Sequence, residues 1–326
     1  MQNKIKIGLI GAGHLGKYHI NHLSKHPDVD FIGFFDTDQE IANQVSSEFS
    51  VKPFEDFNLL IDSVDAVHIV TPTNTHYEIA KECLNKNKDV FIEKPITKSI
   101  KEACDIIDIA EKNGCIVQVG HIERFNPTIN LLKTVFAEPH YIEIERLAPF
   151  QSRGTEVPVV LDLMVHDIDL ILSIVDSKII DVHASGASMM SNTVDLAHAH
   201  IKFKNGVVAN LKSSRIAQNY VRKIRTYEKN LYTITDLMIP QIEVYGLEKT
   251  AVFSDQCIEQ SVETAVGTKN LFYEKIIPEK EDALLKEIDN FVVSIKDRQP
   301  PIVDGVQGLR ALEIALQIEQ KIIKND

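Results

Sequence analysis

The chain has 326 residues, of which 44% are hydrophobic and 25% charged, the composition of an ordinary globular protein. This length exceeds the usual size of a single hydrophobic core, so we expect two domains. The formal net charge of -12 argues against a nucleic-acid partner, because neutralising phosphates requires a basic face. No apolar run approaches the ~20 residues of a membrane span, and a strand pattern begins where a secretory signal would lie. These features predict a cytoplasmic protein.

The first element is an apolar strand pattern at residues 5–10, which runs directly into Gly11-Ala12-Gly13-His14-Leu15-Gly16. This order is typical of a dinucleotide-binding turn. Gly11 permits the tight turn, Gly13 lets the backbone approach a pyrophosphate, and Gly16 lets the next helix pack closely. The helix N-terminus then offers amide groups to the phosphates, with His14 and Leu15 lining the cofactor. The alternative is a tight strand-to-helix turn that binds nothing.

An acidic residue follows the second apolar run at the spacing that the fingerprint requires. Asp36 lies twenty residues after Gly16, where a carboxylate can accept hydrogen bonds from the adenosine ribose. It would repel a 2′-phosphate, and no Lys or Arg follows until Lys52. The sequence therefore predicts NAD as the cofactor in preference to NADP.

Residues 1–120 alternate short strand-like runs with helical periodicity, which predicts a doubly wound parallel sheet, an NAD-binding Rossmann domain. The runs lie near 5–10, 30–35, 65–70, 89–93 and 115–119. Ligands of such sheets bind at the carboxyl ends of the strands. The polar residues at those ends are therefore predicted to bind the cofactor: Thr71, Pro72, Asn74, His76, Glu93 and Lys94.

Residues 121–326 have a different sequence pattern, which predicts an α+β domain with a large open, mainly antiparallel sheet. Long alternating runs surround a hairpin signal at Asn205-Gly206. Helices are expected near 126–136, 159–175, 280–297 and 304–324, and a strand near 140–147. This domain is predicted to bind the substrate and, through its uncovered sheet face, to form a homodimer or homotetramer.

Within the predicted helix at 159–175, Asp162, His166 and Asp169 fall at i, i+4 and i+7 on one face. A histidine held by a carboxylate one turn away is a plausible proton acceptor near neutral pH. The alternative is an Asp/His pair on a solvent-exposed face.

Lys94 follows a buried-looking strand and precedes Pro95, at the edge predicted to hold the cofactor. An ammonium group there would stabilise an alkoxide that develops on a substrate oxygen. The alternative is a surface lysine at a strand-to-turn junction.

No metal or disulfide is predicted. The four cysteines, Cys83, Cys104, Cys115 and Cys257, form no CxxC pair. His198 and His200 share one face of a predicted strand, but no third ligand is evident, so a strand surface or a sheet interface is the favoured interpretation.

Four ordered motifs together resemble the Gfo/Idh/MocA family of NAD(P)-dependent sugar and polyol dehydrogenases: residues 11–16, residues 71–76, Glu93-Lys94-Pro95 and Asp162-x-x-x-His166. The resemblance implies that Lys94 hydrogen-bonds the reacting hydroxyl, that His166 takes its proton, and that Asp162 contacts the substrate. It also implies a peptide before Pro95 that is often cis. Residues 154–158 stand where the family often carries a glycine-rich run, so the shape of the substrate pocket is left open.

Residues 118–127 and 162–169 resemble the branch that contains UDP-N-acetylglucosamine 3-dehydrogenases. The resemblance predicts NAD-dependent oxidation of a sugar hydroxyl, with a nucleotide-activated amino sugar as the leading substrate. Arg124 and Asn126 are predicted to bind substrate, Arg124 through the diphosphate, with Arg153 and Arg215 as further candidates. The alternative for Arg124 is a salt bridge at a helix start. The alternatives for the function are a dehydrogenase or reductase of a free polyol or monosaccharide, and an NAD-binding sensor without catalysis.

Overall fold

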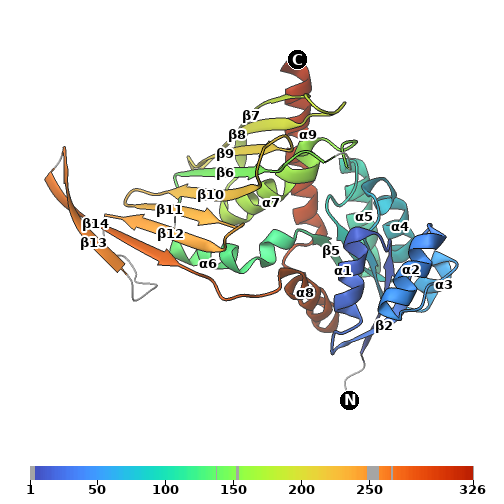
Figure 1. The fold of residues 1–326 in the computed structure, drawn as a ribbon. Coiled ribbons are helices and arrows are strands. Elements are labelled where there is room, and N and C mark those ends of the chain that lie inside the picture. The colour runs from blue at the N-terminus through green and yellow to red at the C-terminus, as the bar shows by residue number, and fades with distance from the viewer. Residues whose placement is uncertain (1–3, 137, 152–153, 248–256, 266, 326) are drawn as a thin grey trace. The chain divides into compact units, whose positions relative to one another are not determined.

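The structure, a computed structural model, describes residues 4–136, 138–151, 154–247, 257–265 and 267–325. The chain forms two compact units, each built from two stretches of sequence. The first consists of Met1–Phe125 and Asp282–Glu313, and the second of Asn126–Glu281 and Ile314–Asp326. Figure 1 shows the elements of both units. The predicted architecture, a parallel Rossmann sheet followed by a larger and mostly antiparallel sheet, is confirmed.

The first unit contains a parallel sheet of five strands in the order β2-β1-β3-β4-β5. The strands are short and apolar because both faces of the sheet are covered by helices. Their bounds are Ile5–Ile10 (β1), Val29–Phe35 (β2), Ala66–Ile69 (β3), Asp89–Glu93 (β4) and Val117–Gly120 (β5). The order places β1 between β2 and β3, so the direction of winding reverses beside β1. Ligands of doubly wound sheets bind at this reversal.

Most helices of this unit begin where the local sequence provides a cap, but α1 and α4 begin without a side-chain cap. The side chains of Asp38, Asp56 and Ser99 accept hydrogen bonds from first-turn amides of α2, α3 and α5. Helix α1 begins after Gly13 and has no such cap. The bounds are His14–Leu23 (α1), Gln39–Phe49 (α2), Phe57–Asp62 (α3), Thr73–Asn85 (α4) and Ile100–Asn113 (α5), with a 3₁₀ turn at Ile122–Phe125 (η1).

Helix α8 (Ala283–Asp297) belongs to the first unit although it lies late in the sequence. Its Phe291 is fully buried and contacts the ring of His68 edge-on. Asp289 on the same helix lies 2.8 Å from Nε2 of His26. Helix α9 (Gly305–Asn325) follows, and its residues divide between the two units after Glu313. The predicted division into one domain at residues 1–120 and another at residues 121–326 therefore stays a prediction, because each compact unit is built from two stretches of sequence.

The second unit contains a sheet of nine strands in the order β13-β14-β12-β11-β10-β6-β9-β8-β7. Only β6 and β9 pair in parallel, and every other neighbouring pair is antiparallel. The bounds are Tyr141–Leu147 (β6), Ile179–Ala187 (β7), Leu196–Phe203 (β8), Val208–Ser214 (β9), Val221–Tyr227 (β10), Leu231–Asp236 (β11), Gln241–Gly246 (β12), Cys257–Thr264 (β13) and Gly267–Ile276 (β14). The last two strands form the hairpin at the end of the sheet in Figure 1.

One face of this sheet is covered and the other is open. Ile142, Ile144 and Ile224 point to the covered face and are buried, whereas the residues between them are only half-buried. Helix α7 (Val165–Ile174) packs against β9, and α6 (Pro127–Val135) packs against β12. This alternation is expected for an antiparallel sheet with a single apolar side.

The helix predicted at residues 159–175 is not a single α-helix. Residues Val160–Met164 (η2) form a π-helical turn, and regular α-helix begins only at Val165. Wide turns of this kind are frequent at functional sites. Asp162 and His166 are half-buried, but Asp169, three residues after His166 on α7, is only 1% exposed. Asp169 therefore does not belong to an exposed polar face.

Candidate active site

The glycine turn after β1 packs against the loop after β3. Gly11 has a φ of +94°, and a Cβ there would lie 2.5 Å from the carbonyl oxygen of Val70 and 2.8 Å from Cγ2 of Thr71. Only glycine fits both the backbone angle and the space. The two loops meet at the reversal in sheet order, where the predicted cofactor residues converge.

The N-terminus of α1 provides an open cradle of the kind that an anionic cofactor needs. A Cβ on Gly13 would meet no atom within 4 Å, and the first turn carries no acidic side chain. A Cβ on Gly16, in contrast, would lie 2.1 Å from the carbonyl oxygen of Gly11. His14 and Leu15 are exposed on this first turn. The amide groups and the positive dipole end of α1 therefore face open space. The first turn of this helix fits a pyrophosphate group.

Asp36 is fixed by the backbone on both of its oxygens. Oδ2 accepts a hydrogen bond from the amide of Ala12 at 2.7 Å, and Oδ1 accepts one from the amide of Asp38 at 2.9 Å. A carboxylate has about four acceptor positions, so each oxygen can still accept a ribose hydroxyl. Lys52, the first cation after Asp36 in the sequence, lies 4.4 Å from the ring centre of Phe54.

His76 connects the loop after β3 with the loop after β4. Its Nε2 lies 2.9 Å from the carbonyl oxygen of Thr71 and its Nδ1 lies 3.0 Å from that of Pro95. The side chain is 1% exposed, and burial lowers its pKa. Pro72 and Asn74 on the same loop are exposed. His76 thus fixes the spacing of the two loops, and its contact with the cofactor stays a prediction.

The end of β4 positions Lys94 beside a restrained carboxylate. Glu93 Oε2 accepts a hydrogen bond from the amide of Lys94 at 3.2 Å, and the Lys94–Pro95 peptide is cis. A Cβ on Gly120, which is paired with Glu93 across β4 and β5, would lie 2.9 Å from the same oxygen. The glycine at the end of β5 therefore leaves the space that the Glu93 carboxylate occupies.

A row of buried side chains that sequence reasoning missed leads to Glu93. His19 Nε2 on α1 lies 3.1 Å from Glu93 Oε1, and His19 Nδ1 lies 3.3 Å from Nδ1 of His68 on β3. His68 is fully buried and stacked on Phe91, and burial together with the charge of His19 holds its pKa well below the usual range. Burial raises the pKa of Glu93. The hydrogen bond and charge of His19 and the charge of Lys94 more than offset that effect, so the pKa of Glu93 lies below its ordinary value.

The sequence did contain a signal for this row. His68 interrupts an otherwise apolar strand, and His19 occupies the sheet-facing side of α1, three residues after Gly16. A polar residue in a buried strand needs a hydrogen-bond partner.

Asp162 and His166 lie in the second unit, on η2 and on the first turn of α7. The buried neighbour Asp167 is paired with Arg146, whose Nε and Nη2 lie 2.9 Å and 2.7 Å from Asp167 Oδ1. Lys94 belongs to the first unit, so the convergence of Lys94 with Asp162 and His166 stays a prediction.

Asp162 also lines a cavity of about 180 Å³ within the second unit. Its walls include three arginines, Arg146, Arg215 and Arg222, of which sequence reasoning considered only Arg215. Sequence alone gave no reason to single out Arg146 or Arg222, because their proximity depends on strand pairing.

The arginines predicted to bind the diphosphate, and Asn126, which is predicted to bind substrate, make the following contacts within the protein. Arg124 Nη2 donates to Gln307 Oε1 at 3.4 Å, and the Asn126 side chain accepts from the amide of Thr128 at 3.0 Å and so caps α6. Arg215 is 6% exposed and donates to the carbonyl oxygens of Gly154 and Val194, each at 3.0 Å. Arg153 lies outside the described residues. The substrate contacts of Arg124 and Asn126 stay predictions.

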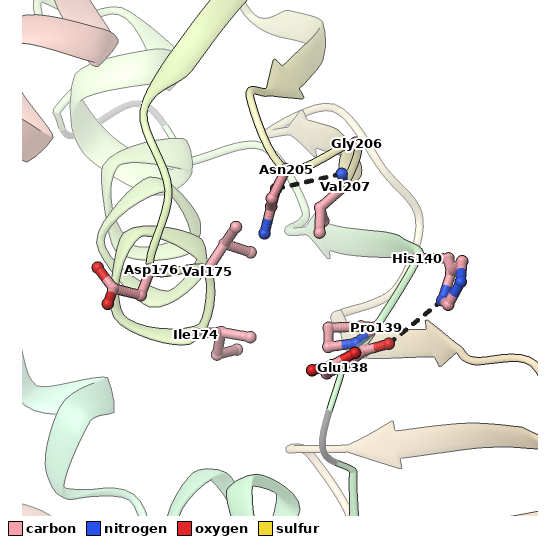
Figure 2. Close-up of a pocket in the computed structure, with 9 residues that line it drawn as sticks. All are labelled: Glu138, Pro139, His140, Ile174, Val175, Asp176, Asn205, Gly206 and Val207. Carbon is pink, nitrogen blue, oxygen red and sulfur yellow. Dashed lines mark hydrogen bonds between the residues drawn. The ribbon is translucent and has the colours of Figure 1, made fainter.

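A second cavity, of about 450 Å³, opens between the end of α7 and the turn between β8 and β9 (Figure 2). Its titratable residues do not form a cluster, since Asp176 and His140 lie on opposite sides of it (Figure 2). None of the predicted site residues lines it.

The described part of the chain holds no group of three or more His, Cys, Asp or Glu side chains placed to bind a metal ion. His200 Nδ1 is instead hydrogen-bonded to Asn210 Oδ1 at 2.8 Å. Within the same described residues, every helix is too short or too polar to cross a membrane.

Comparison with known proteins agrees with this geometry. Residues 5–121 match a family described as an oxidoreductase family with an NAD-binding Rossmann fold, and residues 135–251 match the GFO/IDH/MocA C-terminal domain. The chain is 34% identical over 315 residues to UDP-N-acetylglucosamine 3-dehydrogenase of Acidithiobacillus ferrooxidans, which covers 96% of both chains. A solved structure of that enzyme superimposes with a TM-score of 0.87 at 32% identity, over 98% of each chain.

A myo-inositol 2-dehydrogenase of Thermotoga maritima is 26% identical over 331 residues, which are 94% of this chain and 93% of that protein. The family matches fall on both units, and the relatives align over nearly the whole length. The chain therefore belongs to the GFO/IDH/MocA family of nicotinamide-dependent oxidoreductases that act on CH–OH groups.

Proposed function

We propose that this protein oxidises a secondary hydroxyl of a nucleotide-activated amino sugar with NAD, and that the hydroxyl is the one at the 3-position of UDP-N-acetylglucosamine. The observation that carries the proposal is the Glu93-Lys94-Pro95 turn, which is held by His19, on the helix that begins at the glycine cradle, and by His76. The relative from Acidithiobacillus ferrooxidans supports the substrate. Residues 1–120 would serve as the cofactor domain and residues 121–326 as the substrate domain.

Three side chains have distinct roles in the proposed reaction. His166 takes the proton of the reacting hydroxyl as general base, and Asp162 contacts the substrate and orients that exchange. The Lys94 ammonium stabilises the negative charge that accumulates on the oxygen. The nicotinamide cofactor supplies the acceptor for the hydride when it is bound. A pure NAD-binding sensor needs none of these three groups.

The preference for NAD is supported by the surroundings of Asp36. Its carboxylate is held in place by two backbone amides, so it cannot easily turn away from a 2′-phosphate. Asp38 and Glu40 follow closely and add negative charge. A dianionic phosphate would be repelled at this point.

We also propose a homodimer or homotetramer that forms through the open face of the nine-stranded sheet. Five tyrosines form a row across this face, with neighbouring ring centres 4.8–5.7 Å apart: Tyr141, Tyr227, Tyr232, Tyr245 and Tyr273. Tyrosines are enriched at protein interfaces, because they bury area and still offer a hydroxyl group. The cytoplasmic location stays a prediction from the sequence.

The test is a substrate screen of the purified protein, read as NADH absorbance. UDP-N-acetylglucosamine should reduce NAD, whereas N-acetylglucosamine and inositol should not. Lys94→Ala and His166→Ala should each lower turnover by about 100- to 10,000-fold while leaving NAD binding nearly intact. Unchanged turnover in both variants would refute the assigned roles.

The alternative is oxidation of a free polyol or monosaccharide. It is favoured by the similarity to the myo-inositol 2-dehydrogenase of Thermotoga maritima, which also spans nearly the whole chain. NADH formation with inositol but not with any UDP-sugar would select this alternative.

A further inference from the structure

The segment at residues 154–158 leads directly into the π-helical turn η2, which carries Asp162. The segment forms neither helix nor strand, and η2 has no side-chain hydrogen bond at its N-cap, Val159. The backbone carbonyl groups of such a segment need donors from another part of the protein. The side chain that provides these donors therefore also helps to fix where η2 begins.

Arg215, the residue that follows β9, provides them. Its Nη1 donates to the carbonyl oxygen of Gly154 at 3.0 Å, and its Nη2 donates to the carbonyl oxygen of Val157. Nη2 also donates to the carbonyl oxygen of Val194 at 3.0 Å, and Nε lies 3.3 Å from Asp195 Oδ1. All three nitrogens of the guanidinium group thus contact acceptors of the protein, and Arg215 is only 6% exposed. The side chain is therefore placed to hold the backbone of the protein.

The carbonyl oxygen of Val194 connects Arg215 to the start of η2. It accepts hydrogen bonds from Arg215 Nη2 at 3.0 Å and from the amide of Val159 at 2.9 Å. A carbonyl oxygen has two lone pairs, so it can accept both. Within the turn that follows, the amide of Asp162 donates to the carbonyl oxygen of Pro158 at 3.0 Å. Hydrogen bonds therefore lead from the guanidinium group to the backbone that carries Asp162.

The loop before β8 gives Arg215 a fixed support. Asp195 is fully buried, and its Oδ2 accepts the amide hydrogens of residues 189–191 at 2.7–3.0 Å. In the same loop, Thr193 Oγ1 donates to the carbonyl oxygen of Thr155 at 2.8 Å and accepts from Arg215 Nη2 at 3.2 Å. The segment at 154–158 is thus bound to this loop directly through Thr193 and indirectly through Arg215.

We propose that Arg215 is a positioning residue for the oxidation: it holds the start of η2 and thereby orients Asp162 and His166. This inference rests on the proposed function, which assigns the proton transfer to these two side chains. Asp162 lies within η2 and His166 on the first turn of α7, which follows without a break. A shift at the start of η2 would therefore move both side chains. A misplacement of about 1 Å can lower a rate by about 100-fold.

Arg215→Lys is the most informative variant. Lysine keeps a positive charge beside Asp195, but a single ammonium group cannot reach the three carbonyl oxygens that the guanidinium group binds. With UDP-N-acetylglucosamine as substrate, kcat should fall by about 10- to 100-fold, whereas the KM for NAD should not change. The solvent deuterium isotope effect on kcat should increase, because proton transfer becomes the slowest step. Both are measured well below the melting temperature of the variant.

A milder variant keeps the test decisive if Arg215→Lys does not fold. Thr193→Val removes the hydroxyl group that joins Arg215 to Thr155 and preserves the shape of the side chain. It should lower kcat and raise the isotope effect by less than Arg215→Lys does.

Each variant has a matched control. Arg298 in the first unit also binds a carboxylate and a backbone carbonyl, those of Asp89 and Gly114. Thr226 in the second unit shares a buried hydroxyl–hydroxyl hydrogen bond of 2.7 Å with Thr233. Arg298→Lys and Thr226→Val should lower the melting temperature and leave kcat and the isotope effect unchanged.

The outcomes separate this inference from the proposed function. If Arg215→Lys and Thr193→Val lower only the melting temperature, Arg215 is structural and the inference is wrong, while the function stands. If they raise the KM for UDP-N-acetylglucosamine and leave kcat unchanged, Arg215 acts in substrate binding and the positioning role is overturned. If the unmodified protein oxidises inositol and no UDP-sugar, the proposed substrate is wrong, and the same measurements with inositol then decide the role of Arg215.

Discussion

His19 Nε2 lies 3.1 Å from Glu93 Oε1, although the two residues are 74 positions apart in the sequence. The contact joins the first helix of the cofactor unit to the turn that carries Lys94. Since Glu93 also accepts the amide hydrogen of Lys94, the imidazole of His19 restrains the backbone at the proposed catalytic lysine. His19 is thus a positioning residue that acts through Glu93.

Replacing His19 by Ala should change the pH dependence of the reaction. His19 opposes the effect of burial and holds the pKa of Glu93 below its ordinary value, so without it the pKa of Glu93 rises. Glu93 then becomes protonated at a higher pH, and the acid limb of kcat/KM moves upward. The buried carboxylate also loses a partner, which should destabilise the fold by about 1–3 kcal/mol.

The measurement is a kcat/KM profile from pH 4 to pH 8, with His22→Ala as the control. His22 lies on the same helix, but its Nε2 faces Asp282 at 3.4 Å. A profile that is unchanged for His19→Ala, with only a lower melting temperature, would mean that His19 is structural and does not act through Glu93.

Substitution of the second and of the third glycine of the fingerprint should have different effects. A Cβ on Gly16 would lie 2.1 Å from the carbonyl oxygen of Gly11, so Gly16→Ala should lower the melting temperature. A Cβ on Gly13 would touch nothing in the protein, so Gly13→Ala should fold normally. It should nevertheless weaken NAD binding, because the methyl group would occupy space needed by the pyrophosphate. Calorimetry of NAD binding and thermal melts of both variants separate these effects, and normal NAD affinity in Gly13→Ala would refute the placement of the cofactor.

Local signals explain why much of the fold and the cofactor edge could be predicted. The run at residues 5–10 and the glycines after it are adjacent in sequence, so their spacing specifies the strand, the turn and the helix start together. The same holds for Asn205-Gly206 between β8 and β9.

Contacts between distant residues explain what could not be predicted. Arg146 and Arg222 are 76 positions apart, and only the pairing of β6 with β10 makes them neighbours. The π-helical turn at Val160–Met164 was missed for another reason, because its apolar residues fit an α-helical pattern equally well.

Asp36 should govern the choice of cofactor. Asp36→Ala removes the carboxylate that accepts ribose hydroxyls and repels a 2′-phosphate, so kcat/KM should fall for NAD and rise for NADP. Loss of one charged hydrogen-bonding group corresponds to about a tenfold or greater change for NAD. Asp65→Ala is a suitable control, since Asp65 Oδ2 accepts the amide of Lys6 at the opposite, N-terminal end of the strands. A protein that prefers NADP before any substitution would contradict the predicted preference for NAD.

Asp195 should contribute stability that disappears in acid. It is fully buried, and its Oδ2 accepts the amide hydrogens of Met189, Met190 and Ser191 at 2.7–3.0 Å. Burial raises its pKa, but the Ser191 hydroxyl and these three amides more than offset that effect and lower the pKa to about 2. The carboxylate also faces Arg215 Nε at 3.3 Å, so its charge helps to hold Arg215, which lines the cavity beside Asp162.

Because the pKa of Asp195 is lower in the folded chain than in the unfolded chain, its contribution is complete above about pH 4 and is lost between about pH 4 and pH 2. A shift of this size corresponds to about 2 kcal/mol in the free energy of unfolding. Asp195→Asn should therefore be less stable at pH 7 and should lose less further stability between pH 5 and pH 3 than the unmodified protein. Urea denaturation at each pH measures both effects, with the partly exposed Asp181→Asn as the control. An equal loss of stability with pH in Asp195→Asn and in the unmodified protein would show that other carboxylates cause the acid sensitivity.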